Sequence, residues 1–181
     1  ILIISILLCI FSVFKYHLRF NEHRKFNELE KVDLNKAVDA EQISSDLKGL
    51  KWITYIYPNN PQKEIDYLKN VIKIISSDKS KKAILTDYQF LSSTMDIYDY
   101  SPNQWHHSTV SFPIKGQKYF SSYKNFFINN LKKNEISFIY ETTATERSIT
   151  ELIIDKTCFK KERLSEILIK FMLLKNCKDF Q

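Results

Sequence analysis

The stretch KAILTD, at residues 82–87, predicts a short buried strand, because an apolar centre is ended by the polar residues Thr86 and Asp87. A helix that begins at Pro61 precedes it, since a proline in the first turn loses no needed hydrogen bond. The apolar positions of that helix recur every three or four residues, as a face that packs on a sheet requires: Ile65, Leu68, Ile72 and Ile75.

Strands and helices alternate on both sides of this unit. The sequence predicts further strands at residues 51–57, 109–112, 136–140 and 152–154. It predicts further helices at residues 90–97, 117–133 and 161–174, and one or two short amphipathic helices within 33–47. Alternation of this kind favours a parallel sheet with helices on its faces. We therefore expect an α/β fold with a mostly parallel sheet of about four strands flanked by helices.

The first residues, 1–14, form an uncharged apolar run. A helix over this run covers about 21 Å, whereas a bilayer core is about 30 Å thick. Because the sequence begins with isoleucine rather than methionine, we expect the run to be the last part of a truncated transmembrane helix. A secretory signal peptide is an alternative, but it requires a basic start and a small-residue cleavage site. A buried core segment is the other alternative.

The residues that follow the apolar run are typical of a helix leaving a bilayer. Residues 15–25 include four lysine or arginine residues and only one acid, and aromatic residues are interleaved with them. Aromatic rings favour the headgroup level of a membrane, and cations meet lipid phosphates there. We therefore divide the chain into a transmembrane end with a juxtamembrane helix, residues 1–30, and a soluble α/β domain, residues 31–181.

Composition excludes several classes of function. The chain has two glycines, which excludes a glycine-rich phosphate loop and a dinucleotide fingerprint, so no cofactor is predicted. The formal net charge is +6, but the lysines are spread along a chain rich in residues with A/T-rich codons. A nucleic-acid-binding protein concentrates its cations on one face, so nucleic acid is not a predicted partner.

Two stretches carry candidate site residues. Asp87 and Tyr88 follow the strand at 82–87, and ligands gather beyond the carboxyl ends of strands in open α/β sheets. Alternatively, the side chain of Asp87 caps the next helix.

The second stretch, YDYSPNQWHH at 98–107, holds acids, imidazoles and an indole. Side chains of these types bind zinc or move protons. However, the adjacent residues His106 and His107 point in opposite directions on an extended chain, so no metal site is predicted. The alternatives are a surface loop whose Trp105 plugs the core and a saccharide subsite.

Three cysteines occur, and none lies in a CxxC pair, which argues against zinc and thioredoxin chemistry. Cys9 lies in the apolar run. Cys158 and Cys177 can form a disulfide in an oxidising compartment, whereas in the cytosol they are free thiols.

Several stretches together resemble a known family. They are residues 15–30, residues 34–40, GLKWIT at 49–54, LTDYQF at 85–90, SPNQW at 101–105, SFP at 111–113 and YKNFF at 123–127. The set resembles the last transmembrane helix and the C-terminal soluble domain of bacterial polytopic glycosyltransferases of the GT-C type. These enzymes are similar to dolichyl-phosphate-mannose–protein mannosyltransferases.

The resemblance implies transfer of a sugar from a polyprenyl-phosphate carrier to an acceptor at the membrane surface. In such enzymes the catalytic acid lies in an early loop, which these residues do not include, so no catalytic residue is carried over. The chain is then a non-catalytic portion whose partners are membrane lipid and, through the rest of the enzyme, the lipid-linked sugar donor. Gln104 departs from the pattern, since arginine is commoner within the SPN-x-W motif. The residues assigned as candidate acceptor or sugar contacts are Asp87, Tyr88, Asn103, Trp105, His106 and His107.

Two other functions stay open. One is a single-pass membrane-anchored α/β domain that binds or scaffolds, and the other is a soluble enzyme that uses Asp87 and a histidine of the pair at 106 and 107.

The side of the membrane on which the domain lies is also open. The cationic flank after Phe14 favours a cytoplasmic domain. The resemblance and a bridge between Cys158 and Cys177 favour the extracytoplasmic side, which we expect.

Overall fold

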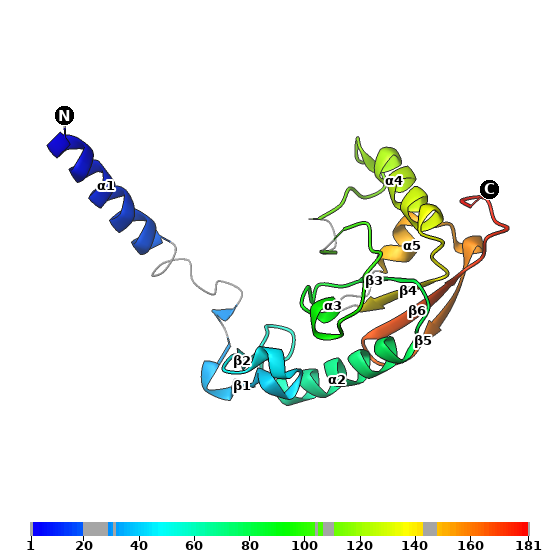
Figure 1. Cartoon of the computed structure of the whole chain (residues 1–181), viewed down its shortest axis with the longest axis horizontal. Helices are drawn as coiled ribbons and strands as arrows, with labels where there is room; N and C mark the ends of the chain where they lie inside the picture. The colour runs from blue at the N-terminus through cyan, green and yellow to red at the C-terminus, as the bar shows by residue number, and fades with distance from the viewer. Residues whose placement is uncertain are drawn as a thin grey trace.

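The structure is a computed structural model that describes residues 2–19, 29–30, 32–103, 105–106, 111–142 and 148–180. These residues form an α/β fold (Figure 1). The helices are α1 (Leu2–His17), α2 (Pro61–Ser77), α3 (Leu91–Thr94), α4 (Phe120–Lys133) and α5 (Ile149–Ile153). The strands are β1 (Val38–Asp39), β2 (Lys51–Trp52), β3 (Lys82–Leu85), β4 (Phe138–Thr142), β5 (Phe159–Arg163) and β6 (Leu168–Leu173).

The main sheet is mixed rather than mostly parallel. Its strand order is β3-β4-β6-β5; β3 and β4 are parallel, whereas β6 is antiparallel to both of its neighbours. The predicted strands at 82–87 and 136–140 correspond to β3 and β4, and the predicted helix at 117–133 corresponds to α4. The expectation of a mostly parallel sheet was wrong because the C-terminal part of the domain forms a hairpin.

The predicted helix at 161–174 is that hairpin, β5 and β6. Strand β6 lies between β4 and β5; its face with Ile169, Phe171 and Leu173 is buried, whereas the other face ends in the exposed Met172. Its sequence, LIKFML, is nearly continuously apolar, and periodicity alone does not separate such a run from a buried helix. The backbone N–H groups of Leu164 and Ser165 both donate to the carbonyl of Leu168, which closes the turn between the two strands.

Two other predicted strands also differ from the structure. The segment at 152–154 belongs to the end of the short helix α5 and its exit, because Ser148 caps that helix and the place beside β4 is taken by β6. The strand at 51–57 is shortened to β2, because the hydroxyl of Thr54 accepts from the N–H groups of Ile56 and Tyr57 and turns the chain. Of the predicted strand at 109–112, residues 109–110 lie outside the described residues, and Ser111 and Phe112 form a bend rather than a strand.

Helices cover both faces of the sheet (Figure 1). Ala83 and Leu85 of β3 pack in one apolar cluster with residues of α4 and α5. Ile84, between them in sequence, faces the other way and packs in a second cluster with residues of α2. This alternation gives three layers, with the sheet in the middle.

The outer edge of β3 is covered by the segment around residues 99–106. The carboxylate of Asp99 accepts from the N–H of Ile84 at 3.0 Å, and the N–H of Tyr100 donates to the carbonyl of Lys82 at 3.2 Å. The N–H of His106 donates to the carbonyl of Thr86 at 3.2 Å. The segment therefore satisfies backbone groups that an open sheet edge leaves unpaired, and it holds the candidate residues of this segment beside β3.

The chain between α1 and α2 contains no long element in its described part. The predicted amphipathic helices within 33–47 are three one-turn 3₁₀ helices, and β1 lies between the first two of them. These helices are η3 (Leu34–Lys36), η4 (Ala40–Gln42) and η5 (Ser45–Leu47). β1 pairs with β2 in a small antiparallel sheet that packs near the start of α2 (Figure 1).

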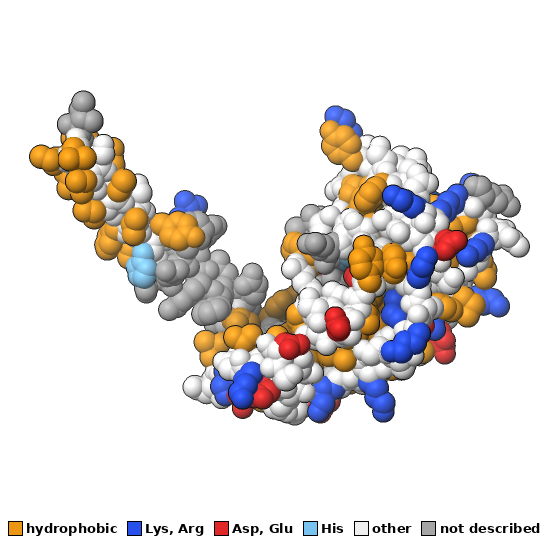
Figure 2. All heavy atoms as spheres, in the orientation of Figure 1, with side chains coloured by type: hydrophobic (Ala, Val, Ile, Leu, Met, Phe, Trp, Pro, Cys, Tyr) orange, Lys and Arg blue, Asp and Glu red, His pale blue; other side chains and the backbone are white. Residues whose placement is uncertain are grey.

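Helix α1 has none of its residues buried. Figure 2 shows hydrophobic side chains over the visible face of this helix. Among the helices of the described part of the chain, none combines the length and the apolar character needed to cross a membrane. The juxtamembrane helix predicted within 15–30 lies mostly outside the described residues.

Cys158 and Cys177 are joined in a disulfide, with a Cα–Cα distance of 5.3 Å. Cys158 ends the 3₁₀ helix η6 (Lys156–Cys158), just before β5, and Cys177 follows β6. The bond therefore fixes the C-terminal segment to the start of the hairpin. Cys9 is a free, exposed thiol on α1.

Replacing Cys158 and Cys177 together by serine lowers the free energy of unfolding by about 3 kcal/mol, because the bond closes a loop across a separation of 19 residues in the unfolded chain. Urea unfolding of the full chain in micelles, followed by tryptophan fluorescence, measures the difference. Cys9→Ser, which removes a free thiol on α1, is the control and leaves the unfolding free energy unchanged. Equal unfolding free energies for the double variant and the control would contradict the prediction.

Candidate functional site

Strands β3 and β4 end in polar residues at the same edge of the sheet, because parallel strands share a carboxyl edge. The hydroxyl of Thr142, at the end of β4, donates to the hydroxyl of Thr86, which follows β3, at 2.5 Å. The N–H of Tyr88 also donates to the hydroxyl of Thr86, at 2.9 Å. The two strand ends are thus joined by side chains, and the chain after β3 turns sharply at Asp87.

Glu141 is a fully buried carboxylate on β4, one residue before this edge. It accepts from the N–H of Ile149 at 2.6 Å, and from the N–H and the hydroxyl of Thr150 at 3.1 and 2.9 Å. The hydroxyl of Ser148 donates to it as well, at 3.0 Å. Burial raises the pKa of Glu141. The carboxylate satisfies the first N–H groups of α5, so its role is to hold this helix on the sheet.

His106 is 2% exposed and lies beside the carboxyl end of β3. Its ring centroid is 6.4 Å from that of Phe112. Within the described residues, neither ring nitrogen has a hydrogen-bond partner. Burial lowers the pKa of His106 to about 4, so the imidazole is neutral at pH 7. His107, its predicted companion, lies outside the described residues.

A chain of ring contacts links His106 to Asn103. Phe112 stacks on Tyr123 of α4 with a centroid distance of 5.7 Å. The amide of Asn103 donates to the hydroxyl of Tyr123 at 2.9 Å. Burial raises the pKa of Tyr123 to about 12, which keeps this hydroxyl protonated. His106 and Asn103 therefore lie on the face of the sheet that α4 covers.

Tyr88 points to the opposite face, where it contacts Glu64 of α2. Glu64 is fully buried and accepts from the hydroxyl of Tyr88 at 2.7 Å, the indole N–H of Trp52 at 2.9 Å and the hydroxyl of Thr54 at 2.8 Å. Burial, and then the charge of Glu64, raise the pKa of Tyr88, so Tyr88 remains a donor. The sequence analysis missed Glu64, although its place on the buried face of α2, beside Ile65, is a signal that could have found it.

The structure contradicts the alternative roles considered for Asp87 as a helix cap and for Trp105 as a plug of the core. The helix after Asp87, α3, has Phe90 as its N-cap and no side-chain cap, so Asp87 does not cap it. Trp105 is 38% exposed and does not plug the core. Its neighbour His106 is buried instead, because successive side chains of an extended segment point to opposite sides.

A polar cleft lies between α3 and the segment that covers β3. Its volume is about 460 Å³, and its lining residues are Gln89, Ser92, Ser93, Ile97, Tyr98, Asp99, Ser101 and Asn103. Asp99 is fixed at the back of this cleft, because its Oδ1 accepts from the N–H groups of Ile84 and Ser101. Burial raises the pKa of Asp99 to about 6. Of the predicted contact residues that the structure describes, only Asn103 lines the cleft.

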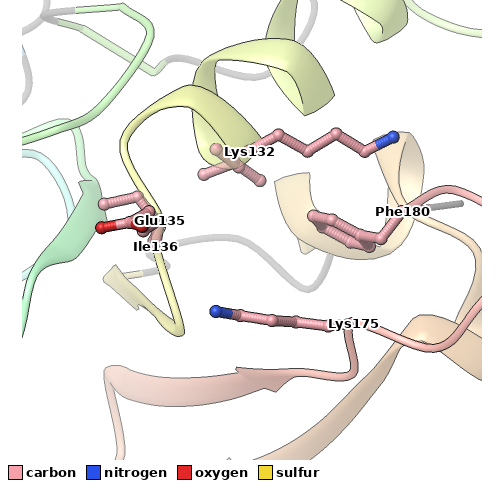
Figure 3. A pocket seen from close by; sticks show the side chains of 6 residues that line it. Lys132, Glu135, Ile136, Lys175 and Phe180 are labelled. Carbon is pink, nitrogen blue, oxygen red and sulfur yellow. The ribbon is translucent and has the colours of Figure 1, made fainter.

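A second pocket lies between the end of α4 and the C-terminal segment (Figure 3). Lys132, Lys175 and Phe180 line it, and the ring of Phe180 lies between the two lysine side chains. Its volume is about 140 Å³, well below the range of about 300–1,000 Å³ for small-molecule sites. We therefore treat this pocket as a feature of packing beside the disulfide-bonded segment.

Neither the polar cleft nor the second pocket forms a metal centre within the described residues. Within the described ranges, no group of three or more His, Cys, Asp or Glu residues could hold a metal ion. Both fully buried carboxylates, Glu64 and Glu141, accept several hydrogen bonds, so they serve packing rather than proton transfer. The chemistry that the described residues support best is therefore binding through the polar side chains of the cleft.

Searches against protein-family models, curated proteins and solved structures found no match to this chain.

The folded domain loses stability between pH 6.5 and pH 4 through His106. The unfolded state binds a proton near pH 6.5, whereas the folded state resists protonation down to about pH 4, so the stability from the neutral ring is lost as the pH falls. The loss at pH 4 is about 3 kcal/mol. The substitution His106→Gln removes this pH-dependent loss. The difference in unfolding free energy between the unchanged chain and the variant therefore changes by about 3 kcal/mol from pH 7 to pH 4.

This difference isolates His106 from Asp99, whose raised pKa acts in the opposite direction over the same pH range. His17→Gln, which replaces an exposed histidine of α1, is the matched control and leaves the profile unchanged. If the difference between the His106 variant and the unchanged chain stays constant from pH 7 to pH 4, the neutral buried state of His106 is wrong.

Proposed function

We propose that this chain is the C-terminal part of a polytopic membrane glycosyltransferase of the GT-C type, which transfers a sugar from a polyprenyl-phosphate carrier. In this proposal the portion described is itself non-catalytic and helps to shape the acceptor side of the enzyme. The motif set from residue 15 to residue 127 supports the family, and the surface of α1 supports the membrane association.

The observation that carries the proposal is the exposure of the large apolar side chains of α1. They are 50–74% exposed: Leu2, Ile3, Ile4, Ile6, Leu7, Leu8, Ile10, Phe11, Val13 and Phe14. A helix that is apolar on all sides requires apolar surroundings on all sides. Its 16 residues cover about 24 Å of a bilayer core of about 30 Å. In the proposal α1 is the bilayer-embedded end of a longer helix, with Lys15 and Tyr16 at the headgroup level.

The disulfide between Cys158 and Cys177 favours an oxidising compartment, and hence the extracytoplasmic side of the inner or cell membrane. The cations that follow the apolar run favour the opposite side. The charge bias acts through all the loops of a polytopic protein, and the first helices usually dominate. We therefore give the disulfide more weight than this single flank.

A single-pass membrane-anchored α/β domain that binds or scaffolds is the second candidate. It is favoured by the polar cleft beside α3, which suits ligand binding without chemistry. On the face that Figure 2 shows, lysine and arginine side chains are scattered rather than gathered in one patch. A nucleic-acid-binding protein concentrates its cations on one face, so this distribution does not favour nucleic acid as a partner in either candidate function.

The full chain, synthesised without detergent in the presence of phosphatidylethanolamine and phosphatidylglycerol vesicles, floats with the vesicles in a density gradient. The double substitution Leu7→Lys and Phe11→Lys abolishes flotation, because each lysine costs about 3 kcal/mol near the centre of a membrane-embedded helix. Leu34→Lys with Tyr55→Lys is the matched control and floats, since these residues are similarly exposed but lie outside α1. An unchanged chain that stays at the bottom of the gradient as a monomer would overturn the membrane association.

The reading frame upstream of Ile1 separates the two candidates. The glycosyltransferase requires many further hydrophobic helices and an acid in an early loop between them. A start codon a few residues upstream would instead leave a single-pass protein and remove the first candidate.

A further inference from the structure

The cleft between α3 and the segment that covers β3 is lined mainly by groups that form hydrogen bonds. They comprise one carboxylate, two side-chain amides and three hydroxyls, which belong to Asp99, Gln89, Asn103, Ser92, Ser93 and Ser101. The cleft volume of about 460 Å³ falls within the range of about 300–1,000 Å³ typical of small-molecule sites. Its size and polarity therefore suit a small polar ligand.

Most of this hydrogen-bonding capacity is unused within the described residues. The side chains of Gln89, Ser92 and Ser93 form no hydrogen bond there, and the buried hydroxyl of Ser101 has no partner. Of these, the side chains of Gln89, Ser92 and Ser93 are free to bind hydroxyl groups of a ligand.

Two residues hold fixed positions in the cleft. Asp99 is held through its Oδ1 by the N–H groups of Ile84, at 3.0 Å, and of Ser101, at 2.8 Å. Its Oδ2 takes no hydrogen bond from the described residues, and Asp99 is one of the residues that line the cleft. Asn103 is held through its Nδ2 by the hydroxyl of Tyr123, which leaves its Oδ1 as an acceptor. Because the protein already fixes these groups, a ligand would not need to order them.

An aromatic ring completes the lining. Tyr98 is 76% exposed, and Tyr100 holds it through an edge contact with a centroid distance of 4.6 Å. One face of an exposed tyrosine ring provides a flat apolar surface beside the polar groups. The C–H bonds of a pyranose ring pack against such a surface while its hydroxyls reach the polar side chains.

The charge of the lining excludes other ligand classes. None of the described residues that line the cleft is a lysine or an arginine, and the carboxylate of Asp99 repels anions, so a phosphate or a carboxylated ligand does not fit. A cation has a single carboxylate to bind, whereas Ca²⁺ requires several oxygen ligands with compensating charge. A ligand without polar groups would leave the side chains of Gln89, Ser92 and Ser93 without partners.

We propose that this cleft binds a neutral saccharide, with Asp99 and Asn103 accepting from its hydroxyls and the ring of Tyr98 packed against one sugar face. The identification of this saccharide with the glycosyl acceptor rests on the proposed function. Binding itself depends only on the cleft.

The test is a titration of the full ¹⁵N-labelled chain, in zwitterionic micelles without a sugar headgroup, with glucose, mannose, galactose and N-acetylglucosamine at millimolar concentration. At least one of the four shifts the amide resonances of residues 89–103 in a saturable manner. Tyr98→Ala weakens that binding at least tenfold because it removes the stacking face. Asp99→Asn weakens it as well while keeping the Oδ1 that accepts from Ile84.

Tyr119→Ala is the matched control, since Tyr119 is an exposed tyrosine outside the cleft, and it leaves the affinity unchanged. The proposal is overturned if none of the four sugars gives saturable shifts, if the shifts lie elsewhere, if inorganic phosphate binds the cleft instead, or if Tyr98→Ala binds as tightly as the control. Vesicle flotation is independent of this titration. A chain that floats but binds no sugar refutes the saccharide site alone, and a chain that binds sugar but does not float refutes the membrane association alone.

Discussion

The buried carboxylate of Glu141 is the interaction on which the carboxyl end of the sheet depends. A carboxylate removed from water loses its hydration, which costs several kcal/mol unless the protein replaces it. Here Ser148, Ile149 and Thr150 supply four donors, and two of these donors are N–H groups at the start of α5. The helix is short, so without Glu141 those N–H groups would lose the partner that fixes the helix on the sheet. The need to satisfy one charge therefore positions β4 and α5 together.

Glu64 fulfils the corresponding role on the other face. Its three donors come from Trp52, Thr54 and Tyr88, which lie outside α2, the first two before it and the third after β3. The carboxylate thus joins α2 to the small β1–β2 unit and to the chain that leaves β3. Each face of the sheet is anchored by one buried acid, and both oxygens of each carboxylate accept hydrogen bonds from the protein. This arrangement explains why the most buried acids are not the residues that are available to a ligand.

The sequence predicts elements that a local pattern of residues marks. The stripe of α2 and the apolar centre of β3 depend on neighbouring residues alone, and both elements were found as expected. Strand β6 was assigned to a helix because five of its six residues are apolar, so its sequence lacks the alternation that identifies a strand. Helix α5 escaped prediction because its start is stabilised by the side chain of Glu141, eight residues before Ile149. The candidate site was predicted in part for the same reason: the SPNQW segment indicates a special loop, but only its backbone pairing with β3 decides that His106 is buried and Trp105 is exposed.

The way that segment covers β3 also determines where ligand chemistry is available. An edge strand must have its N–H and C=O groups satisfied, and here a side chain, Asp99, replaces a backbone partner for Ile84. A carboxylate in this role uses one oxygen for the edge and leaves the other without a partner among the described residues, whereas a paired strand would have presented no such group. The protection of the edge thus creates a fixed acceptor at the back of the cleft. The same segment carries Tyr98 before Asp99 and Asn103 after it, so one stretch of chain both closes the sheet and lines the cleft. The need to protect the edge of β3 therefore places polar groups with unused hydrogen-bonding capacity in the cleft. The buried acids Glu64 and Glu141, on the two faces of the sheet, do not line the cleft.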